Sequence, residues 1–256
     1  DQLKKKHDKP FFMGVGFYRP HVPMYASQKW FDMHPRGKIK LPLIHKNDRN
    51  DLSQYAIDLT NLNHVSPTHK WVSEAGQWDH AVQSYLASVT FADHCLGLVL
   101  DALESSDYAD NTIIALFSDH GFHLGEKERW AKRSLWEDGT RVPIIVSAPG
   151  YKKNQRSDRP AELLDVFPTL LELAGLSADS SQEGQSLVPL MKNPKKEWKH
   201  PAITSFGLGN YSVRSTRYRF IQYFDGSREL YDLRKDPHEW KNLAADPKNK
   251  SIIEEH

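Results

Sequence analysis

Apolar residues recur every three or four positions over residues 79–105, and this spacing predicts an amphipathic helix. Two short apolar runs follow at residues 112–117 and 142–147, and their length and continuity are typical of buried strands. We expect the helix and both strands to form one α/β unit whose crossover is right-handed.

Weaker patterns flank this unit. Residues 10–17 predict a buried strand, and residues 160–175 predict a helix that Pro168 should kink and Gly175 should end. Residues 24–75 are proline-punctuated and polar, so only a short helix beginning near Ser27 is expected there. This segment could form a rim that selects substrate, or a solvated excursion without chemistry.

The character of the chain changes at about residue 195. Short alternating segments rich in aromatic residues follow, joined by Gly and Asp turns, and they predict an antiparallel sheet. We therefore divide the chain into residues 1–195, which belong to an α/β domain, and residues 196–256, which form a small subdomain.

The composition limits the classes of protein to consider. The chain has 256 residues, 39% of them hydrophobic, which is enough for a sizeable core. Its net charge of +1, from 34 basic and 33 acidic residues, creates no overall field that would call for nucleic acid or a membrane. There is no run of about 18 apolar residues, so no membrane span is expected. Cys95 is the single cysteine, so no internal disulfide can form.

Candidate chemistry begins where the run at residues 112–117 ends. Asp119 and His120 come at its carboxyl end, where open α/β sheets hold their sites, and Gly121 releases the chain into a loop. A carboxylate beside an imidazole is half of a metal site, although such a pair could also be a structural hydrogen bond. Four basic residues that suit an anionic substrate follow in the loop: Lys127, Arg129, Lys132 and Arg133.

Longer strings around this loop carry a resemblance. The second signature of the type I sulfatases is similar to Ser-Asp-His-Gly-Phe-His-Leu-Gly-Glu at residues 118–126, Trp-Ala-Lys-Arg-Ser-Leu-Trp-Glu at 130–137 and Thr-Arg-Val-Pro at 140–143. The similarity is greatest to the iduronate-2-sulfatase branch. Arg-Pro-His-Val-Pro at 19–23 and Leu-Tyr-Asp-Leu at 230–233 also resemble sulfatase segments. Nearly the whole chain is covered, but only the C-terminal part of the enzyme is matched.

This resemblance implies an α/β fold, with an alkaline-phosphatase-like mixed sheet between helices and a small C-terminal antiparallel α+β subdomain. It implies a sulfuric ester hydrolase acting on a sulfated carbohydrate. The iduronate-2-sulfatase branch points to the 2-O-sulfate of a uronic acid in a glycosaminoglycan or an algal polysaccharide. It also implies a secreted, periplasmic or lysosomal location.

The resemblance further implies roles for individual residues. Asp119 and His120 are the expected metal ligands. Lys132 is expected to contact the sulfate, and His21 to bind the sulfate or to protonate the departing oxygen. Three residues are weaker candidates for shaping the sugar pocket: Arg133, Phe122 and His123. From the residues alone, a loop histidine such as His21 is usually a surface residue, and Phe122 would simply pack beneath the loop.

Two arguments about the metal disagree. Chemistry alone assigns an Asp and a His to zinc or another transition ion, because imidazole is a poor ligand for calcium. The resemblance implies Ca2+, with two further aspartates and the oxygen of the nucleophile completing the shell. We follow the resemblance.

The nucleophile that the resemblance implies is a formylglycine made within a Cys-x-Pro-x-Arg-like motif. Cys95 does not fit this motif, because Leu96-Gly97-Leu98-Val99 follows it. We therefore expect the formylglycine and an early Asp-Asp metal pair to lie upstream, in a missing N-terminal half of the enzyme. By itself, this chain is expected not to turn over.

Two alternatives stay open. A zinc-dependent phosphatase or phosphodiesterase of the same superfamily would use the Asp-His pair equally well, and stoichiometric zinc with phosphate ester activity would indicate it. A non-catalytic carbohydrate-binding homologue could keep the sheet and the anion-binding loop without a nucleophile. A Cys-x-Pro/Ala-x-Arg run upstream would exclude that second alternative.

Overall fold

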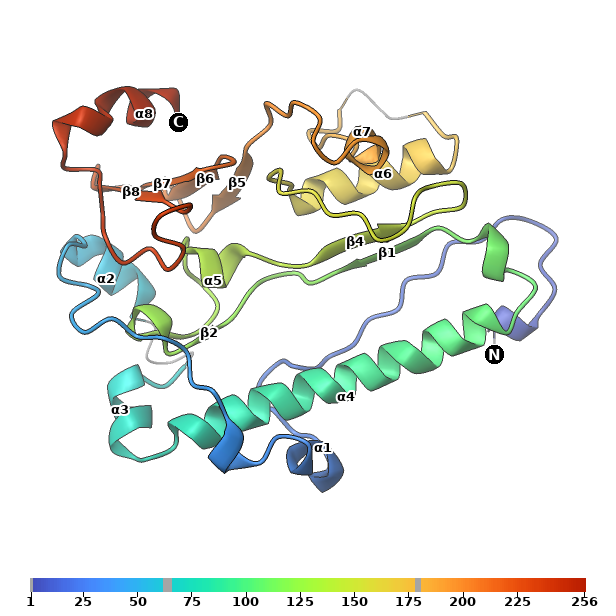
Figure 1. Cartoon of the computed structure of the whole chain (residues 1–256), viewed down its shortest axis with the longest axis horizontal. Coiled ribbons are helices and arrows are strands. Elements are labelled where there is room, and N and C mark those ends of the chain that lie inside the picture. Colours follow the sequence, from blue (N-terminus) through green and yellow to red (C-terminus); the bar gives the residue numbers. More distant parts are fainter. Residues whose placement is uncertain (1, 62–65, 178–180) are drawn as a thin grey trace. The chain divides into compact units, whose positions relative to one another are not determined.

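The computed structural model describes residues 2–61, 66–177 and 181–256 and contains two compact units (Figure 1). The first unit comprises residues 1–42 and 70–112, and the second comprises residues 43–69 and 113–256. The described residues include six short 3-10 helices: Gln2–Lys4, Arg36–Lys38, Ala109–Asn111, Glu126–Glu128, Leu163–Asp165 and Pro247–Asn249.

The first unit is built on α4 (Trp78–Glu104), which confirms the helix predicted over residues 79–105. α1 (Gln28–Asp32), the short helix expected near Ser27, packs against α4. The ring of Trp30 is buried between the two helices, 6.0 Å from the ring of Phe91 and 5.0 Å from that of His94. The apolar stripe of α4 therefore anchors part of the proline-punctuated segment.

By length and composition alone, α4 could cross a membrane, although no membrane span was expected from the sequence. The same criterion is met by core helices of globular proteins. Charged residues interrupt the helix at Asp93 and Asp101, and α1 packs against it, but only 11% of its most apolar window is buried within the described residues. Length and composition alone do not make α4 a membrane helix.

The strand predicted over residues 10–17 is not formed. Within the part of the chain that the structure describes, this segment pairs with no strand, and the side chain of Phe12 is exposed. A strand exists only through hydrogen bonds to a neighbour, so apolar composition alone was not sufficient. α3 (His69–Glu74) joins the second unit to the first along the chain.

In the second unit, β1 (Ile114–Phe117) and β4 (Ile144–Ser147) form a two-stranded sheet. Both predicted strands are confirmed, but they pair antiparallel, with Ile114 opposite Ser147 and Phe117 opposite Ile144. The expected right-handed crossover is therefore wrong, because that rule applies to parallel strands. The expected burial is also wrong, since the side chains of Phe117 and Ile145 are 50% and 56% exposed and a two-stranded sheet covers neither face completely.

The helix predicted over residues 160–175 is shorter than expected. α6 (Val166–Leu173) follows the 3-10 turn Leu163–Asp165 directly. The kink or break predicted at Pro168 takes the form of a change from the 3-10 turn to the α-helix just before it, and Pro168 itself lies in the first turn of α6, where its missing N–H removes no intrahelical bond. Gly175 follows the helix at φ +70°, a conformation that glycine adopts without strain, and ends it as predicted.

The predicted C-terminal antiparallel sheet is confirmed. β5 (Ala202–Ser205), β6 (Tyr211–Arg214), β7 (Tyr218–Gln222) and β8 (Arg228–Asp232) pair in sequence order, every pair antiparallel. The turn between β7 and β8 contains Gly226 at φ +84°. Five shorter elements complete the unit: α2 (Gln54–Thr60), the β2–β3 hairpin (His123–Leu124 and Trp130–Ala131), α5 (Glu137–Thr140), α7 (Val188–Lys192) and α8 (Lys250–Glu255).

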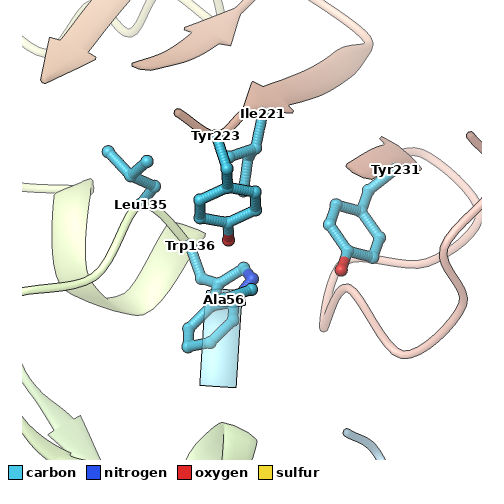
Figure 2. Close-up of a cluster of buried hydrophobic side chains, with 6 residues drawn as sticks. All are labelled: Ala56, Leu135, Trp136, Ile221, Tyr223 and Tyr231. Carbon is cyan, nitrogen blue, oxygen red and sulfur yellow. The ribbon is translucent and has the colours of Figure 1, made fainter. Parts of the chain in front are cut away.

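A buried cluster in this unit joins three parts of the sequence (Figure 2). It consists of Ala56 of α2, Leu135 and Trp136 before α5, and Ile221, Tyr223 and Tyr231 of the C-terminal sheet region. The fully buried carboxylate of Glu229 accepts hydrogen bonds from Trp136 Nε1 at 2.7 Å, Tyr223 OH at 2.8 Å and Tyr231 OH at 2.7 Å. The C-terminal sheet thus packs against the end of the loop between β1 and β4. This loop carries Lys127, Arg129, Lys132 and Arg133 and is called the basic loop below.

Candidate active site

The backbone after β1 places Asp119 and His120 side by side. His120 Nδ1 lies 2.7 Å from the carbonyl oxygen of Gly121, and a carbonyl can only accept, so Nδ1 carries the proton. His120 Nε2 therefore presents a lone pair, 3.6 Å from Asp119 Oδ2. The side chain of Asp119 is 84% exposed. A free imidazole nitrogen beside an accessible carboxylate, with the other ring nitrogen fixed by a carbonyl, suits two metal ligands.

Gly121 sets the path of the backbone directly after Asp119 and His120. The N–H of Gly121 donates to the carbonyl oxygen of Gly139 at 3.0 Å, which ties the end of β1 to α5. A Cβ atom at Gly121 would lie 2.1 Å from the carbonyl oxygen of Asp138, so no larger residue fits without a backbone shift. The close approach of these two backbones explains why the chain can turn immediately after His120.

Asp119 and His120 line a cavity of about 1750 Å³ within the second unit, together with Lys132 and Arg133. Four of the seven predicted site residues are thus brought to one cavity. Ten basic residues line it against four acidic ones, so the cavity attracts anions although the chain as a whole is almost neutral. The basic residues are Lys132, Arg133, Arg141, Lys152, Lys153, Arg156, Arg159, Arg214, Arg219 and Arg234.

The backbone on both sides of Lys132 is unusual. Ala131 and Arg133 have φ values of +68° and +64°, a left-handed conformation that is costly for residues with a side chain. The carbonyl oxygen of Lys132 accepts a hydrogen bond from Arg129 Nη2 at 2.9 Å. Lys132 therefore stands at a pinned corner of the loop, and its side chain enters the cavity from there.

The other two basic residues of the loop face inward. The side chain of Lys127 is 2% exposed, and its Nζ donates to Asp48 Oδ1 at 2.9 Å and to the carbonyl oxygen of Glu239. Buried Arg129 donates to the carbonyl oxygen of Thr60. Burial lowers the pKa of Arg129 to about 10, with a smaller contribution from nearby arginines, so it keeps its charge at neutral pH. The expectation that Lys127 and Arg129 serve an anionic substrate is corrected, because both are already bound within the protein.

His123 and Phe122 do not belong to the described residues that line the cavity. His123 is completely buried, with Nε2 2.7 Å from Ser134 Oγ and its ring edge-on to Trp136. Burial, assisted by the positive charge of Arg129, lowers the pKa of His123 to about 3, so the ring is neutral. The structure does not bring these two residues to the predicted sugar pocket.

His21 lies in the first unit, in an exposed loop. Its Nδ1 is 2.6 Å from the carbonyl oxygen of Val22, and its ring lies 5.0 Å from that of Tyr18. A fixed Nδ1–H leaves Nε2 as the atom for substrate chemistry. The role of His21 beside Lys132 stays a prediction.

Sequence reasoning missed a group of arginines that gather around the carboxylate of Glu137, one of which, Arg219, also pairs with Glu239 at 2.7 Å. Glu137 of α5 pairs with Arg219 of β7, with Arg214 of β6 at 3.3 Å and with Arg141 at 3.8 Å, and all four residues line the cavity. Burial acts to raise the pKa of Glu137, but the guanidinium groups of Arg219 and Arg214 outweigh it, and the pKa is lowered. No local motif marks this group, because strand pairing far along the sequence brings it together.

Comparison with known families and proteins identifies the class. The family model described as Sulfatase matches residues 1–176, and the model described as N-sulphoglucosamine sulphohydrolase, C-terminal, matches residues 125–256. The first match covers more than half of the chain, and the chain therefore belongs to the sulfatase family.

Individual relatives agree with this assignment. The chain is 44% identical to a sulfatase of Formosa agariphila over 99% of its own length and 50% of that protein. It is 29% identical to the Delta 4,5-hexuronate-2-O-sulfatase of Bacteroides thetaiotaomicron, again over 99% of the chain and over 56% of that protein. The chain thus spans about half the length of these curated relatives.

Solved structures confirm the fold. A 2-O GAG sulfatase matches with a TM-score of 0.62 at 31% identity, over 70% of this chain and 42% of that one. The phosphonate monoester hydrolase of Agrobacterium radiobacter matches with a TM-score of 0.81, over 97% of this chain and 55% of that one. At 23% identity, this second match shows the fold alone. The predicted alkaline-phosphatase-like α/β fold is therefore confirmed. The mixed sheet expected within it is not formed by the described residues, because all their strand pairs are antiparallel.

Proposed function

We propose that this chain forms the sulfate-binding half of a sulfatase that removes the 2-O-sulfate of a uronic acid. The observation that carries the proposal is the convergence of Asp119, His120, Lys132 and Arg133 on one cavity with an excess of basic residues. A sulfate ester is an anion, and its hydrolysis needs positive charge near the sulfuryl oxygens.

Asp119 and His120 are proposed to hold a divalent cation, which following the family would be Ca2+. The donor set present here supports cation binding, since His120 Nε2 carries a lone pair beside the Asp119 carboxylate. A cation bound there neutralises negative charge on the ester. The remaining ligands and the formylglycine nucleophile would come from the upstream half of the enzyme.

Lys132 is proposed to place its ammonium group against the sulfuryl oxygens. Its pinned backbone means that little backbone freedom is lost at this residue when substrate binds. Arg133, exposed on the same cavity, is suited to the uronate carboxylate. His21, in its imidazolium form with a proton on each ring nitrogen, would donate the Nε2 proton to the sugar oxygen as the ester S–O bond breaks, which prevents the departure of a strongly basic alkoxide.

The substrate class rests on the relatives. One of them is named a Delta 4,5-hexuronate-2-O-sulfatase, and one solved structure is a 2-O GAG sulfatase. An acidic sugar carries both a carboxylate and a sulfate, and the basic residues of the cavity suit both. The secreted, periplasmic or lysosomal location stays a prediction with the same basis.

The test uses the complete enzyme, including the upstream half, and three substrates. They are a disaccharide with a 2-O-sulfated, unsaturated uronate, one with a 6-O-sulfated glucosamine, and a phosphate monoester. We expect sulfate release from the first substrate to be the fastest. Lys132→Ala is assayed beside the wild type on the same substrates. Lys250→Ala is its matched control, because this lysine is 79% exposed on α8 and does not line the cavity.

The same assay separates the alternatives. Turnover of the phosphate ester with stoichiometric zinc, and none of the sulfate esters, would identify a phosphatase or phosphodiesterase instead. Tight binding of the sulfated disaccharides without turnover of any substrate would identify a carbohydrate-binding homologue.

A further inference from the structure

A second group of metal-ligand side chains lies in the basic loop, distinct from Asp119 and His120. His123, Glu126 and Asp138 each present one ligand atom, and these three atoms lie within 4.8 Å of one another. His123 belongs to β2, Glu126 to the following 3-10 turn and Asp138 to α5. A metal ion bound by all three would connect β2 and the 3-10 turn that follows it to α5.

The histidine of this cluster has the form of a metal ligand. His123 is completely buried, and no hydrogen bond of normal geometry reaches its Nδ1 among the described residues, although the backbone of Glu126 lies close enough to act on the ring. Its Nε2 lies 2.7 Å from Ser134 Oγ, which can accept an N–H. Histidines that bind metals usually donate their other N–H to such a polar group, which fixes the ring. With the proton on Nε2, Nδ1 carries a buried lone pair that needs a partner.

The two carboxylates also need positive charge nearby. Glu126 Oε2 accepts a hydrogen bond from the N–H of Leu124 at 2.7 Å, which fixes the side chain over β2. Burial raises the pKa of Glu126, and the proximity of Asp138 raises it further. Asp138 is exposed to solvent on one side, but the protein atoms packed around its carboxylate raise its pKa, and the neighbouring Glu137 raises it further. A divalent cation between the two carboxylates would offset both effects.

The positive groups near the cluster are already engaged. Lys127 pairs with Asp48, and Arg129 donates to backbone carbonyl oxygens. His238 acts on both carboxylates and lowers the pKa of each, but more weakly than burial raises it. The three ligand atoms within 4.8 Å of one another, with the buried Nδ1 of His123 among the groups that lack a normal hydrogen bond, form the geometry that a cation would bind.

We propose that His123, Glu126 and Asp138 bind a divalent transition ion, with zinc the best match, as a structural site separate from the catalytic cation. One imidazole nitrogen and two carboxylate oxygens suit zinc better than calcium, and water would supply the remaining position. The bound ion closes the loop that carries Lys132, from β2 to α5. It acts on the reaction only by holding Lys132 and Arg133 in place.

The test is calorimetric titration of zinc chloride into this chain after treatment with EDTA and dialysis. We expect one equivalent of zinc to bind, and X-ray absorption to show only nitrogen and oxygen ligands. Glu126→Gln and Asp138→Asn should each weaken binding by at least about tenfold. Glu128→Gln is the matched control, because Glu128 lies in the same 3-10 turn but is exposed and outside the cluster.

The double variant D119N/H120N separates this site from the catalytic one and should still bind one zinc ion. Loss of binding in that variant, or equal affinity in Glu126→Gln, Asp138→Asn and Glu128→Gln, would overturn the proposal. Because Asp138 is at the surface, Asp138→Asn decides the question if Glu126→Gln does not fold. Zinc should also raise the melting temperature of the wild-type chain but not that of Asp138→Asn.

Discussion

The basic loop contains two buried basic side chains, Lys127 and Arg129, and two that line the cavity, Lys132 and Arg133. The first two, called the inner charges, are bound within the protein, and the second two, called the outer charges, are open to a ligand. Lys127 is buried between Asp48 and a backbone carbonyl group, whereas Lys132, five positions later, enters the anion-attracting cavity. Arg129 and Arg133 repeat the contrast, one buried and one exposed. A positive charge in a loop therefore indicates a substrate contact only when its partners within the protein are known.

The largest effect should come from breaking the inner pair. Lys127→Met leaves the carboxylate of Asp48 buried without a partner and should lower the free energy of unfolding by about 3–5 kcal/mol. Urea unfolding of the chain at pH 7 measures this. Lys132→Met is the matched control and should change stability by no more than about 0.5 kcal/mol. Equal losses in both variants would abolish the distinction between the inner and outer charges.

The outer charge should matter for turnover. Lys132→Ala in the complete enzyme should lower kcat/KM for the sulfate ester more than about tenfold, or about 2–4 kcal/mol in transition-state stabilisation, because the developing charge loses its cation. His21→Ala should be similarly damaging. Unchanged kinetics in either variant, measured at several pH values, would remove that residue from the active site.

A smaller effect concerns the arginine group on Glu137. The pKa of Glu137 is lowered in the folded state, so its contribution to stability is present above its ordinary value of 4.5 and is lost as pH falls through the folded value. The slope from this one group is at most about 1.4 kcal/mol per pH unit. Urea midpoints between pH 7 and pH 3.5 should fall less steeply in Glu137→Gln. An identical slope in both proteins would contradict the lowered pKa.

The smallest effect should come from an exposed ion pair. Arg36 forms a two-point contact with Asp79 in the first unit, at 2.9 and 2.7 Å, but both side chains are open to water. Exposed pairs gain little because water screens them and ordering the side chains costs entropy. Arg36→Ala should therefore shift the urea midpoint least among these variants. A loss as large as that of Lys127→Met would show that burial does not set the value of an ion pair here.

Sequence patterns predicted the elements with strong local signals. α4, β1, β4 and the C-terminal sheet follow from periodicity and turn residues, and the place of Asp119 at the end of β1 follows from chain order. The direction of β1–β4 pairing did not follow, because it depends on the path of the loop between them. The segment at residues 10–17 shows the same limit, since a strand requires a partner that the segment itself does not reveal.

The candidate site was predictable to a similar extent. Asp119, His120, Lys132 and Arg133 reach one cavity as the motif indicated. The inward direction of Lys127 could not be read from its neighbours, because Asp48 lies 79 positions away along the chain. The same holds for Arg214 and Arg219, whose position on the cavity wall depends on the pairing of β6 and β7.

The shared packing of Trp136 with Tyr223 and Tyr231 has a consequence for any shortened form of this protein. A protease cut or an early stop codon before β6 would remove three arginines, Arg214, Arg219 and Arg234, from the cavity wall and would also uncover the indole that supports the far end of the loop. Ligand recognition and solubility would then fail together, so the strands β6 to β8 cannot be trimmed as a dispensable appendage.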